Sequence, residues 1–251
     1  MADFFATAKR SLGDDNAANR GSDATLARMP FDPGNRSKLT RRDLGRFGED
    51  TLFHRIAREV CECECLARKE LFEAWEVARR TRRRFRGGRV IDLACGHGLL
   101  AHILLLLDDS SPSALAIDAR LPQSARRLHE RLVGAWPRLG GRIELVQAEI
   151  SSVTLDHGDL LVSCHACGSL TDAVLNRAIA ADARVAVLPC CHDALANDQG
   201  GLGGWIDPAL AIDVTRAARL REHGFNVHTQ TIPAAITPKN RLLLAEPASN
   251  R

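Results

Sequence analysis

Apolar and polar residues alternate in blocks along most of the chain, in a pattern typical of strands separated by helices. Short apolar runs bounded by glycine, proline or polar residues are predicted as strands, at 90–93, 114–118, 143–146, 159–163 and 184–188. Between them, apolar residues recur at helical spacing, in a helix that opens at Leu99 and in helices over 124–133 and 172–180. This alternation predicts an α/β protein built on a parallel sheet.

The C-terminal part of the chain departs from that alternation. A helix over 208–223 is predicted to end at Gly224, a residue type favoured just after helix C-termini. Two strands follow, at 226–232 and 241–246, and residues 233–240 join them without room for a helix. Such a pair forms an antiparallel hairpin, which is foreign to an ordinary dinucleotide-binding fold.

The N-terminal part shows a change of composition. Residues 1–40 are rich in Asp, Asn, Gly, Ser and Arg without periodicity, which is typical of a flexible tail. Residues 50–84 have helical spacing with no internal proline or glycine, which predicts one long or two shorter helices packed beside the sheet. The expected organisation is a flexible tail (1–40), a helical extension (41–86) and an α/β domain (87–251).

A glycine turn after the first predicted strand is the best candidate for a cofactor site. Gly96 and Gly98 let the backbone approach a ligand closely, and the helix that follows points its N–H groups at the turn. The segment from Gly96 to Ala101 fits the dinucleotide fingerprint, with Asp118 about 20 residues further on. However, Asp92 ends the strand before the turn, where its carboxylate would repel a pyrophosphate but suit a cationic amino group. S-adenosylmethionine carries such a group and no phosphate.

The same segment resembles motif I of the class I S-adenosylmethionine-dependent methyltransferases, with Ala94 in place of the first glycine. The resemblance covers about residues 89–247 and implies a seven-stranded Rossmann-like sheet. It also implies that Asp118 binds the ribose hydroxyls and that Glu149 lies near the adenine. The alternative is that these two acids only end strands and cap the next elements. The predicted cofactor-binding residues are Asp92, Ala94, Gly96, Gly98, Asp118 and Glu149.

Two further strand ends are polar and rich in sulfur. Residues 163–172 contain the pattern H-x-C-G-x-x-T-D, and residues 189–193 contain Cys-Cys-His. Because the carboxyl ends of strands carry the chemistry of open α/β sheets, both segments are expected at the active site. The combination resembles the methyltransferase family that includes the eukaryotic tRNA ribose methyltransferases of the acceptor stem. Asp172, at the start of a helix, is interpreted as its N-cap.

Several chemical roles are open to these side chains. His165 or His192 could be a general base, and Cys190 or Cys191 could attack a pyrimidine ring. Zinc could bind among both groups, or the cysteines could simply be buried in the pocket wall. The predicted catalytic residues are His165, Cys167, Cys190, Cys191 and His192, and the six zinc candidates are Cys164, His165, Cys167, Cys190, Cys191 and His192. No metal ligands are assigned.

Composition narrows the partners only slightly. The 251 residues carry a formal net charge of +3, too small to indicate nucleic acid by itself. Arginines nevertheless crowd residues 79–86, where they could bind phosphates or could form a solvated helix end. Cysteines 61, 63 and 65 would face different sides of a helix, so partial burial is expected of them.

The sequence therefore predicts a methyltransferase that uses S-adenosylmethionine, with RNA as the first candidate acceptor. A small-molecule acceptor is the alternative, as is a zinc- or RNA-binding module of this fold without transfer activity. The chain shows no apolar run of membrane-spanning length and no secretory signal, so a cytoplasmic location is expected. No protein partner is evident.

Overall fold

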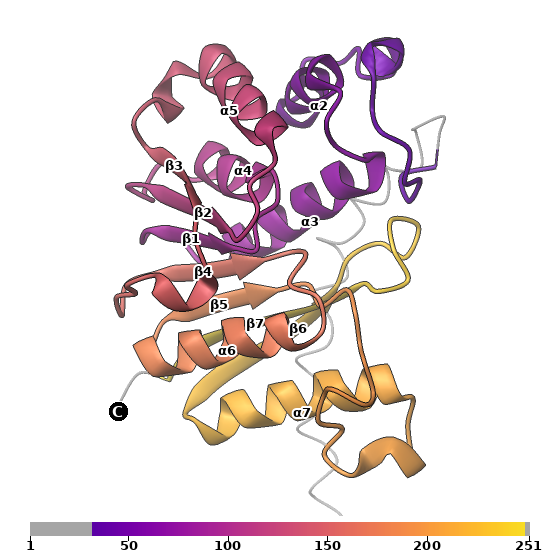
Figure 1. Ribbon diagram of the computed structural model, residues 1–251, viewed down its shortest axis with the longest axis vertical. Helices are drawn as coiled ribbons and strands as arrows, with labels where there is room; N and C mark the ends of the chain where they lie inside the picture. The colour runs from indigo at the N-terminus through magenta and orange to yellow at the C-terminus, as the bar shows by residue number, and fades with distance from the viewer. Residues whose placement is uncertain (1–31, 249–251) are drawn as a thin grey trace, which may run out of the picture.

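A seven-stranded sheet forms the centre of the computed structural model, which describes residues 32–248 (Figure 1). The strands lie in the order β3-β2-β1-β4-β5-β7-β6. Their bounds are β1 Val90–Leu93, β2 Ala114–Asp118, β3 Ile143–Gln147, β4 Leu160–Ser163, β5 Arg184–Val187, β6 Phe225–Thr231 and β7 Arg241–Pro247. Strands β1 to β5 pair in parallel, whereas β7 pairs antiparallel with both β5 and β6. The predicted sheet and its closing hairpin are confirmed.

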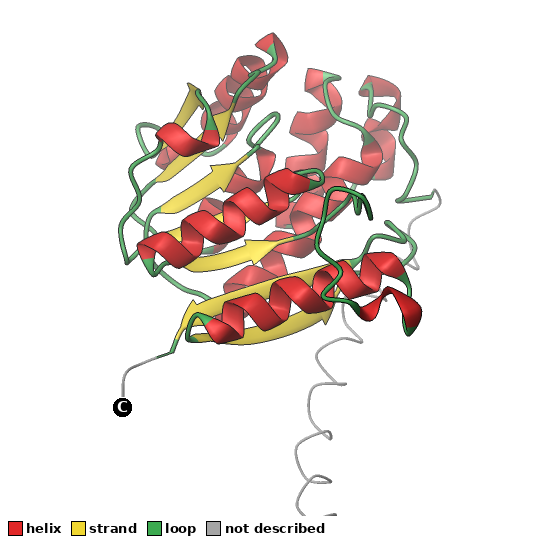
Figure 2. Cartoon of the chain, turned by 60° about the horizontal axis from the view of Figure 1, so that its bottom comes forward, coloured by secondary structure: helices red, strands yellow, loops and turns green. Residues whose placement is uncertain are grey.

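Helices cover both faces of the sheet. Their bounds are α2 Leu52–Cys63, α3 Arg68–Arg84, α4 Leu99–Leu107, α5 Gln123–Ala135, α6 Ser169–Ala181 and α7 Pro208–Glu222, with short 3-10 turns η1 Arg41–Arg46, η2 Pro137–Leu139, η3 Ile150–Ser152 and η4 Leu202–Gly204. Helices α2 to α5 bury their apolar sides in one core and α6 and α7 in another. Figure 2 shows α6 and α7 together in front of the sheet.

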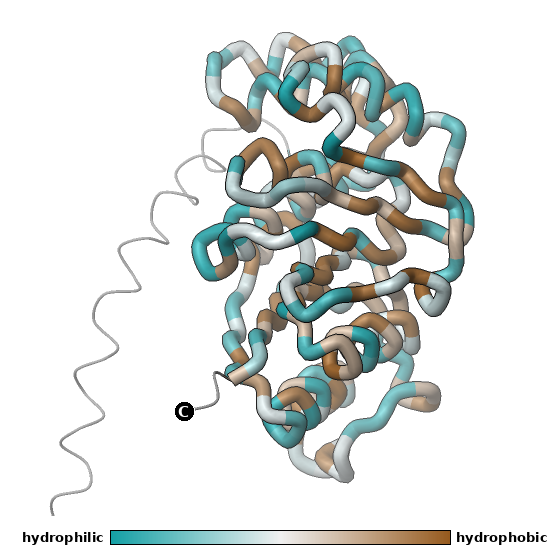
Figure 3. Tube along the Cα trace, turned by 90° about the vertical axis from the view of Figure 1, so that its left-hand side faces the viewer, coloured by the Kyte–Doolittle hydropathy of each residue, from teal (hydrophilic) through white to brown (hydrophobic). Residues whose placement is uncertain are grey.

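Alternation along the central strands explains these two cores. Val90 of β1 belongs to the core under α2 to α5, and the next residue, Ile91, to the core under α6 and α7. Leu160 and Leu161 of β4 divide in the same way. Because successive strand side chains point to opposite faces, a strand covered on both sides carries apolar residues on both faces. Figure 3 shows the resulting hydrophobic strands behind more polar connecting segments.

The helical extension consists of two helices, and it includes more of the chain than the composition predicted. Glu64, with a left-handed φ of 53°, ends α2 before α3 begins. Residues 1–31 of the predicted flexible tail lie outside the described residues. Residues 32–40 pack beside the start of α3, where the Leu39 N–H donates to the Leu66 carbonyl at 2.9 Å and Leu39 is fully buried. Long-range pairing of this kind leaves no periodicity in the sequence.

Helix α3 runs from the carboxyl edge of the sheet to its amino edge. The arginine run over residues 79–86 therefore lies at the amino edge. Arg80 pairs with Glu76, while Arg82 is buried, pairs with Asp108 at 3.1 Å and donates to the Leu104 carbonyl at 3.2 Å. The Arg82 guanidinium thus holds α3 to α4 and is not free to bind phosphate. Arg83, Arg84 and Arg86 are exposed, and phosphate binding by these members of the run stays a prediction.

Cysteines 61, 63 and 65 are all buried, as expected. Among residues 32–248, no helix combines the length and apolar character needed to cross a bilayer.

Candidate cofactor and acceptor site

The glycine turn after β1 is shaped by steric limits at two positions. Gly98 begins α4 with a φ of +70°, and a Cβ there would lie 2.9 Å from Leu145 Cδ2 and 3.2 Å from Ala116 Cβ. Gly96 has a φ of +55°, but a Cβ there would meet nothing within 4 Å. Gly98 is thus required for packing against β2 and β3, whereas Gly96 is required by the backbone conformation and faces open space.

Asp118, at the end of β2, lies against this turn. Its Oδ2 accepts a hydrogen bond from the Gly96 N–H at 2.9 Å, and its Oδ1 accepts one from the Arg120 N–H at 2.9 Å. The carboxylate is therefore fixed at the carboxyl edge of the sheet, with lone pairs left for a ligand's hydroxyl groups.

Asp92 lies beneath the turn and is only 1% exposed. One oxygen accepts a hydrogen bond from the Ala101 N–H at 3.2 Å. Burial, together with the negative charge of Asp118, raises the pKa of this carboxyl to about 8, although the Ala101 hydrogen bond acts in the opposite sense. A buried acid without a cationic partner among the described residues favours a ligand that brings a positive charge.

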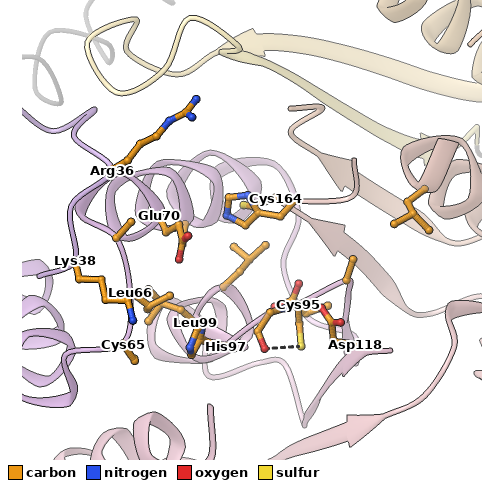
Figure 4. A pocket seen from close by; sticks show the side chains of 18 residues that line it. Arg36, Lys38, Cys65, Leu66, Glu70, Cys95, His97, Leu99, Asp118 and Cys164 are labelled. Atoms are coloured by element: carbon orange, nitrogen blue, oxygen red, sulfur yellow. Dashed lines mark hydrogen bonds between the residues drawn. The ribbon is translucent and has the colours of Figure 1, made fainter. Parts of the chain in front are cut away.

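These groups share one cavity of about 510 Å³. Asp92, Ala94, Gly96 and Asp118 line it together with His97, so four of the six predicted cofactor residues are brought together. Figure 4 shows the cavity between this turn and α3.

The other two predicted cofactor residues do not line the cavity. Gly98 lies behind the turn, where it packs against β2 and β3. Glu149 is exposed and precedes η3, so its contact with the adenine stays a prediction.

Ala94 occupies the position where the motif has glycine, and its φ of 55° is left-handed. This conformation costs an L-residue about 1–2 kcal/mol, and glycine avoids that cost. Only part of the gain appears as stability, because a chain with glycine has more conformational entropy to lose on folding. We expect Ala94→Gly to raise the free energy of unfolding by about 0.5 kcal/mol. Urea denaturation followed by circular dichroism measures this change. Ala101→Gly, inside α4, is the control and should lower stability, and a loss of stability in Ala94→Gly would contradict the argument.

His165 and Glu70 also line the cavity. His165 follows β4, while Glu70 lies in the first turn of α3 and points toward the cavity (Figure 4). Burial raises the pKa of Glu70, and nearby His165 acts against that rise. Glu70 was not predicted from the sequence, because α3 reaches this edge only through the packing of the extension.

His192 lies outside this cavity. Its Nε2 is 2.8 Å from Asp213 Oδ1, its side chain is 2% exposed, and its Nδ1 is buried without a partner among the described residues. Asp213 also accepts hydrogen bonds from Arg216 and Arg241. The structure therefore places His192 in a buried ionic network between α7 and β7, and not in the pocket where a general base would act.

The predicted cysteines divide into two sets. Cys164 is buried and lines the cavity, whereas Cys167, Cys190 and Cys191 form a separate group at its side. Burial, followed by hydrogen bonding with Cys167 and the charges of both neighbouring thiols, raises the pKa of Cys190 well above its ordinary value. A thiol in this state is a poor nucleophile at neutral pH, which disfavours attack on a pyrimidine ring.

Asp172 differs from its predicted role as a helix N-cap. The N-cap of α6 is Gly168, and Asp172 lies one turn later. Its carboxylate instead binds Arg216 at 2.7 Å and Arg219 at 3.0 Å, both on α7. This acid joins two helices that the sequence places far apart.

A buried acid ends β1, a glycine turn opens α4 and a second acid ends β2, all in a sheet closed by an antiparallel hairpin. These features define a class I methyltransferase fold, and the pair of carboxylates fits a cationic cofactor better than a diphosphate. Residues 69–198 match a protein-family model described as a methyltransferase domain, which spans just over half of the 251 residues. The chain belongs to this family, and its cofactor is S-adenosylmethionine.

Solved structures of similar fold are distant in sequence. A ribosomal protein L11 methylase from Lactobacillus delbrueckii subsp. bulgaricus is 15% identical, with 72% of this chain and 79% of that chain covered and a TM-score of 0.45. A putative RNA methyltransferase from Pyrococcus horikoshii is 17% identical, with 70% and 83% covered and a TM-score of 0.45. An O-methyltransferase family protein from Burkholderia thailandensis is 17% identical, with 94% and 71% covered and a TM-score of 0.47. No curated protein matches the sequence significantly.

Proposed function

We propose that this methyltransferase acts on RNA, at a nucleotide that enters the cavity from the carboxyl edge of the sheet. The observation that carries the proposal is the distribution of exposed apolar side chains. The large ones in the described part of the chain all follow the carboxyl ends of β4 and β5, and they are Leu170, Leu195, Trp205, Leu210 and Val214. Trp205 is 87% exposed and Leu195 is 100% exposed.

Exposed aromatic and apolar side chains at the carboxyl edge of the sheet can stack against the unpaired bases of RNA. Proteins that bind single-stranded RNA stack its bases on aromatic side chains and neutralise its backbone with basic ones. Arg36 and Lys38 line the cavity, and both are exposed without an ion-pair partner among residues 32–248. These two cations stand where an acceptor's phosphates would pass, unlike the arginines at the end of α3.

Within the cavity, His165 is the group proposed to take the acceptor's proton. Bound S-adenosylmethionine supplies an electrophilic methyl group, and the acceptor atom must lose a proton when it is methylated. An imidazole can both accept and donate a proton and is suited to this transfer. Glu70 is proposed to orient His165 and to stabilise its protonated form. The main contribution of the protein is alignment of acceptor and donor.

The function is tested by mass spectrometry of total RNA from cells with and without the gene. One modified nucleoside should be missing without the gene and should be restored by the purified enzyme with S-adenosylmethionine. Unchanged RNA, together with S-adenosylmethionine-dependent labelling of small metabolites, would assign a small-molecule acceptor instead.

Trp205→Ala should weaken binding of a single-stranded RNA about tenfold, since one stacked base contributes about 1–3 kcal/mol. The affinity for S-adenosylmethionine should not change, because Trp205 does not line the cavity. Fluorescence anisotropy with labelled RNA and calorimetry with the cofactor measure the two affinities.

Arg83→Ala is the matched control, because Arg83 is exposed at the opposite edge of the sheet. It should leave RNA affinity within about twofold of the wild type at moderate salt, where distant exposed charges are screened. Equal weakening by both substitutions would show that RNA binds without preference for the carboxyl edge, and the proposed acceptor surface would be wrong.

A further inference from the structure

Three thiols converge at the ends of two neighbouring strands. Cys167 follows β4, Cys190 and Cys191 follow β5, and these two strands pair directly in the sheet. Cys167 Sγ lies 3.0 Å from Cys190 Sγ, and Cys190 Sγ lies 3.8 Å from Cys191 Sγ. All three sulfur atoms lie within 4.8 Å of one another. In the described part of the chain, no other group of three His, Cys, Asp or Glu side chains gathers its ligand atoms this closely.

This spacing suits a tetrahedral metal ion. Zinc binds thiolates at about 2.3 Å, which places the sulfurs of a tetrahedral site about 3.8 Å apart. The sulfur–sulfur separations, from 3.0 Å to at most 4.8 Å, lie on both sides of this value. Cys167 and Cys191 are exposed, so an ion could enter from solvent without opening the fold.

The two loops that carry the thiols are fixed by one ionic network. Arg216, itself 2% exposed, donates to the carbonyl of Gly168 at 3.1 Å, next to Cys167, and binds Asp172 at 2.7 Å. Asp213 lies within 2.8 Å of His192, next to Cys191. Buried contacts therefore hold both loops in place from the α7 side. Such support is typical of the residues that orient a set of metal ligands.

We propose that Cys167, Cys190 and Cys191 bind one zinc ion as thiolates, with the fourth coordination position open. On binding, each thiol loses its proton to solvent, so that one Zn²⁺ and three thiols give a zinc tris-thiolate and three protons. Three protein ligands with a free position are the arrangement of zinc sites that bind a substrate or water. Cys167 is two residues along the chain from His165, which lines the methyl-transfer cavity.

Neighbouring thiolates repel one another, whereas a divalent cation between them reverses the repulsion. The competing chemistry is oxidation of Cys167 and Cys190 to a disulfide, in which the two thiols lose two electrons and two protons to an oxidant such as dioxygen.

The test is metal analysis of the full-length protein purified under reducing conditions without a chelator. We expect one zinc per chain, loss of zinc on treatment with a chelator, and recovery when zinc alone is added back. Cobalt in place of zinc should give sulfur-to-cobalt charge-transfer absorption. Cys190→Ser should abolish this absorption, whereas Cys61→Ala, which removes a buried thiol on α2, should retain it.

Calorimetry of Cys190→Ser with S-adenosylmethionine shows whether the variant is still folded and binds its cofactor. The same measurement separates loss of the metal site from failure of the proposed function. Retained cofactor binding without zinc supports the proposal. A reduced wild-type protein that takes up neither zinc nor cobalt would overturn it. A Cys167–Cys190 disulfide that persists in protein purified with zinc and reductant would also overturn it.

Discussion

Asp92→Asn is expected to weaken S-adenosylmethionine binding about a hundredfold. The carboxylate is 1% exposed and lines the cofactor cavity, so a ligand's cationic group beside it is shielded from water. Removing one partner of a buried charge pair costs about 2–5 kcal/mol, and about 3 kcal/mol corresponds to roughly a hundredfold in Kd. Isothermal titration calorimetry with the purified protein measures the change.

The pH dependence gives an independent check on this prediction. The pKa of Asp92 is about 8 in the free protein, and a bound cation favours the ionised form. Cofactor affinity should therefore rise as pH increases from about 6 to 8, below the range in which the cofactor's own ammonium loses its proton, and Asp92→Asn should lack this rise. In the free protein the raised pKa has the opposite effect on folding. The folded state keeps a proton that the unfolded state has lost, so stability falls as pH rises from about 4 to 8.

Asp207→Asn is the matched control for Asp92→Asn. Asp207 is an exposed acid whose side chain caps α7 by accepting a hydrogen bond from the Leu210 N–H, and asparagine caps helices equally well. This variant should bind S-adenosylmethionine with wild-type affinity. If Asp92→Asn also binds within threefold of the wild type, then Asp92 does not contact the cationic part of the cofactor.

Asp213→Ala is expected to lower the free energy of unfolding by about 3 kcal/mol, because breaking a buried ion pair leaves its partners unpaired. Asp213 accepts from the Arg241 guanidinium at 2.7 Å and lies 2.8 Å from His192 Nε2. Arg216, also in contact with Asp213, would keep only Asp172 as a carboxylate partner. For a chain of this size, the melting temperature should fall by about 10 °C. Urea unfolding and differential scanning calorimetry measure the two quantities.

The sign of the pH effect identifies the cause of this loss. Burial alone would raise the pKa of Asp213, but hydrogen bonds from His192 and Arg241 outweigh it, so the pKa is lowered. The carboxylate therefore stabilises the fold above about pH 4, and this contribution is lost as pH falls through the lowered pKa. The difference in stability between wild type and Asp213→Ala should narrow in acid. Asp213→Asn keeps a hydrogen-bond acceptor without the charge, so its free energy of unfolding should fall by less. If Asp213→Ala lowers the free energy of unfolding by less than about 1 kcal/mol, the network does not stabilise the fold as proposed.

The strands, the closing hairpin and the glycine turn were predictable because their determinants are local. Apolar runs bounded by turn residues define β1 to β5, and Gly96 and Gly98 mark the turn by their conformational freedom. Asp92 and Asp118 follow from their places at strand ends, since parallel strands bring those ends to one edge. These local patterns were enough to predict the fold and the class of enzyme, and four of the six residues predicted to bind the cofactor line one cavity.

Which polar side chains line the cavity and which form buried ion pairs is visible only in the folded structure. Arg82 and His192 look similar to functional groups in sequence, yet each is buried against an acid from another element. Glu70 reaches the cavity because α3 packs across the sheet edge, and three of the predicted cysteines separate from His165 into a cluster of their own. The physical reason is that the partner of a charge or thiol depends on long-range packing, while hydrophobic periodicity records only which side of an element is buried.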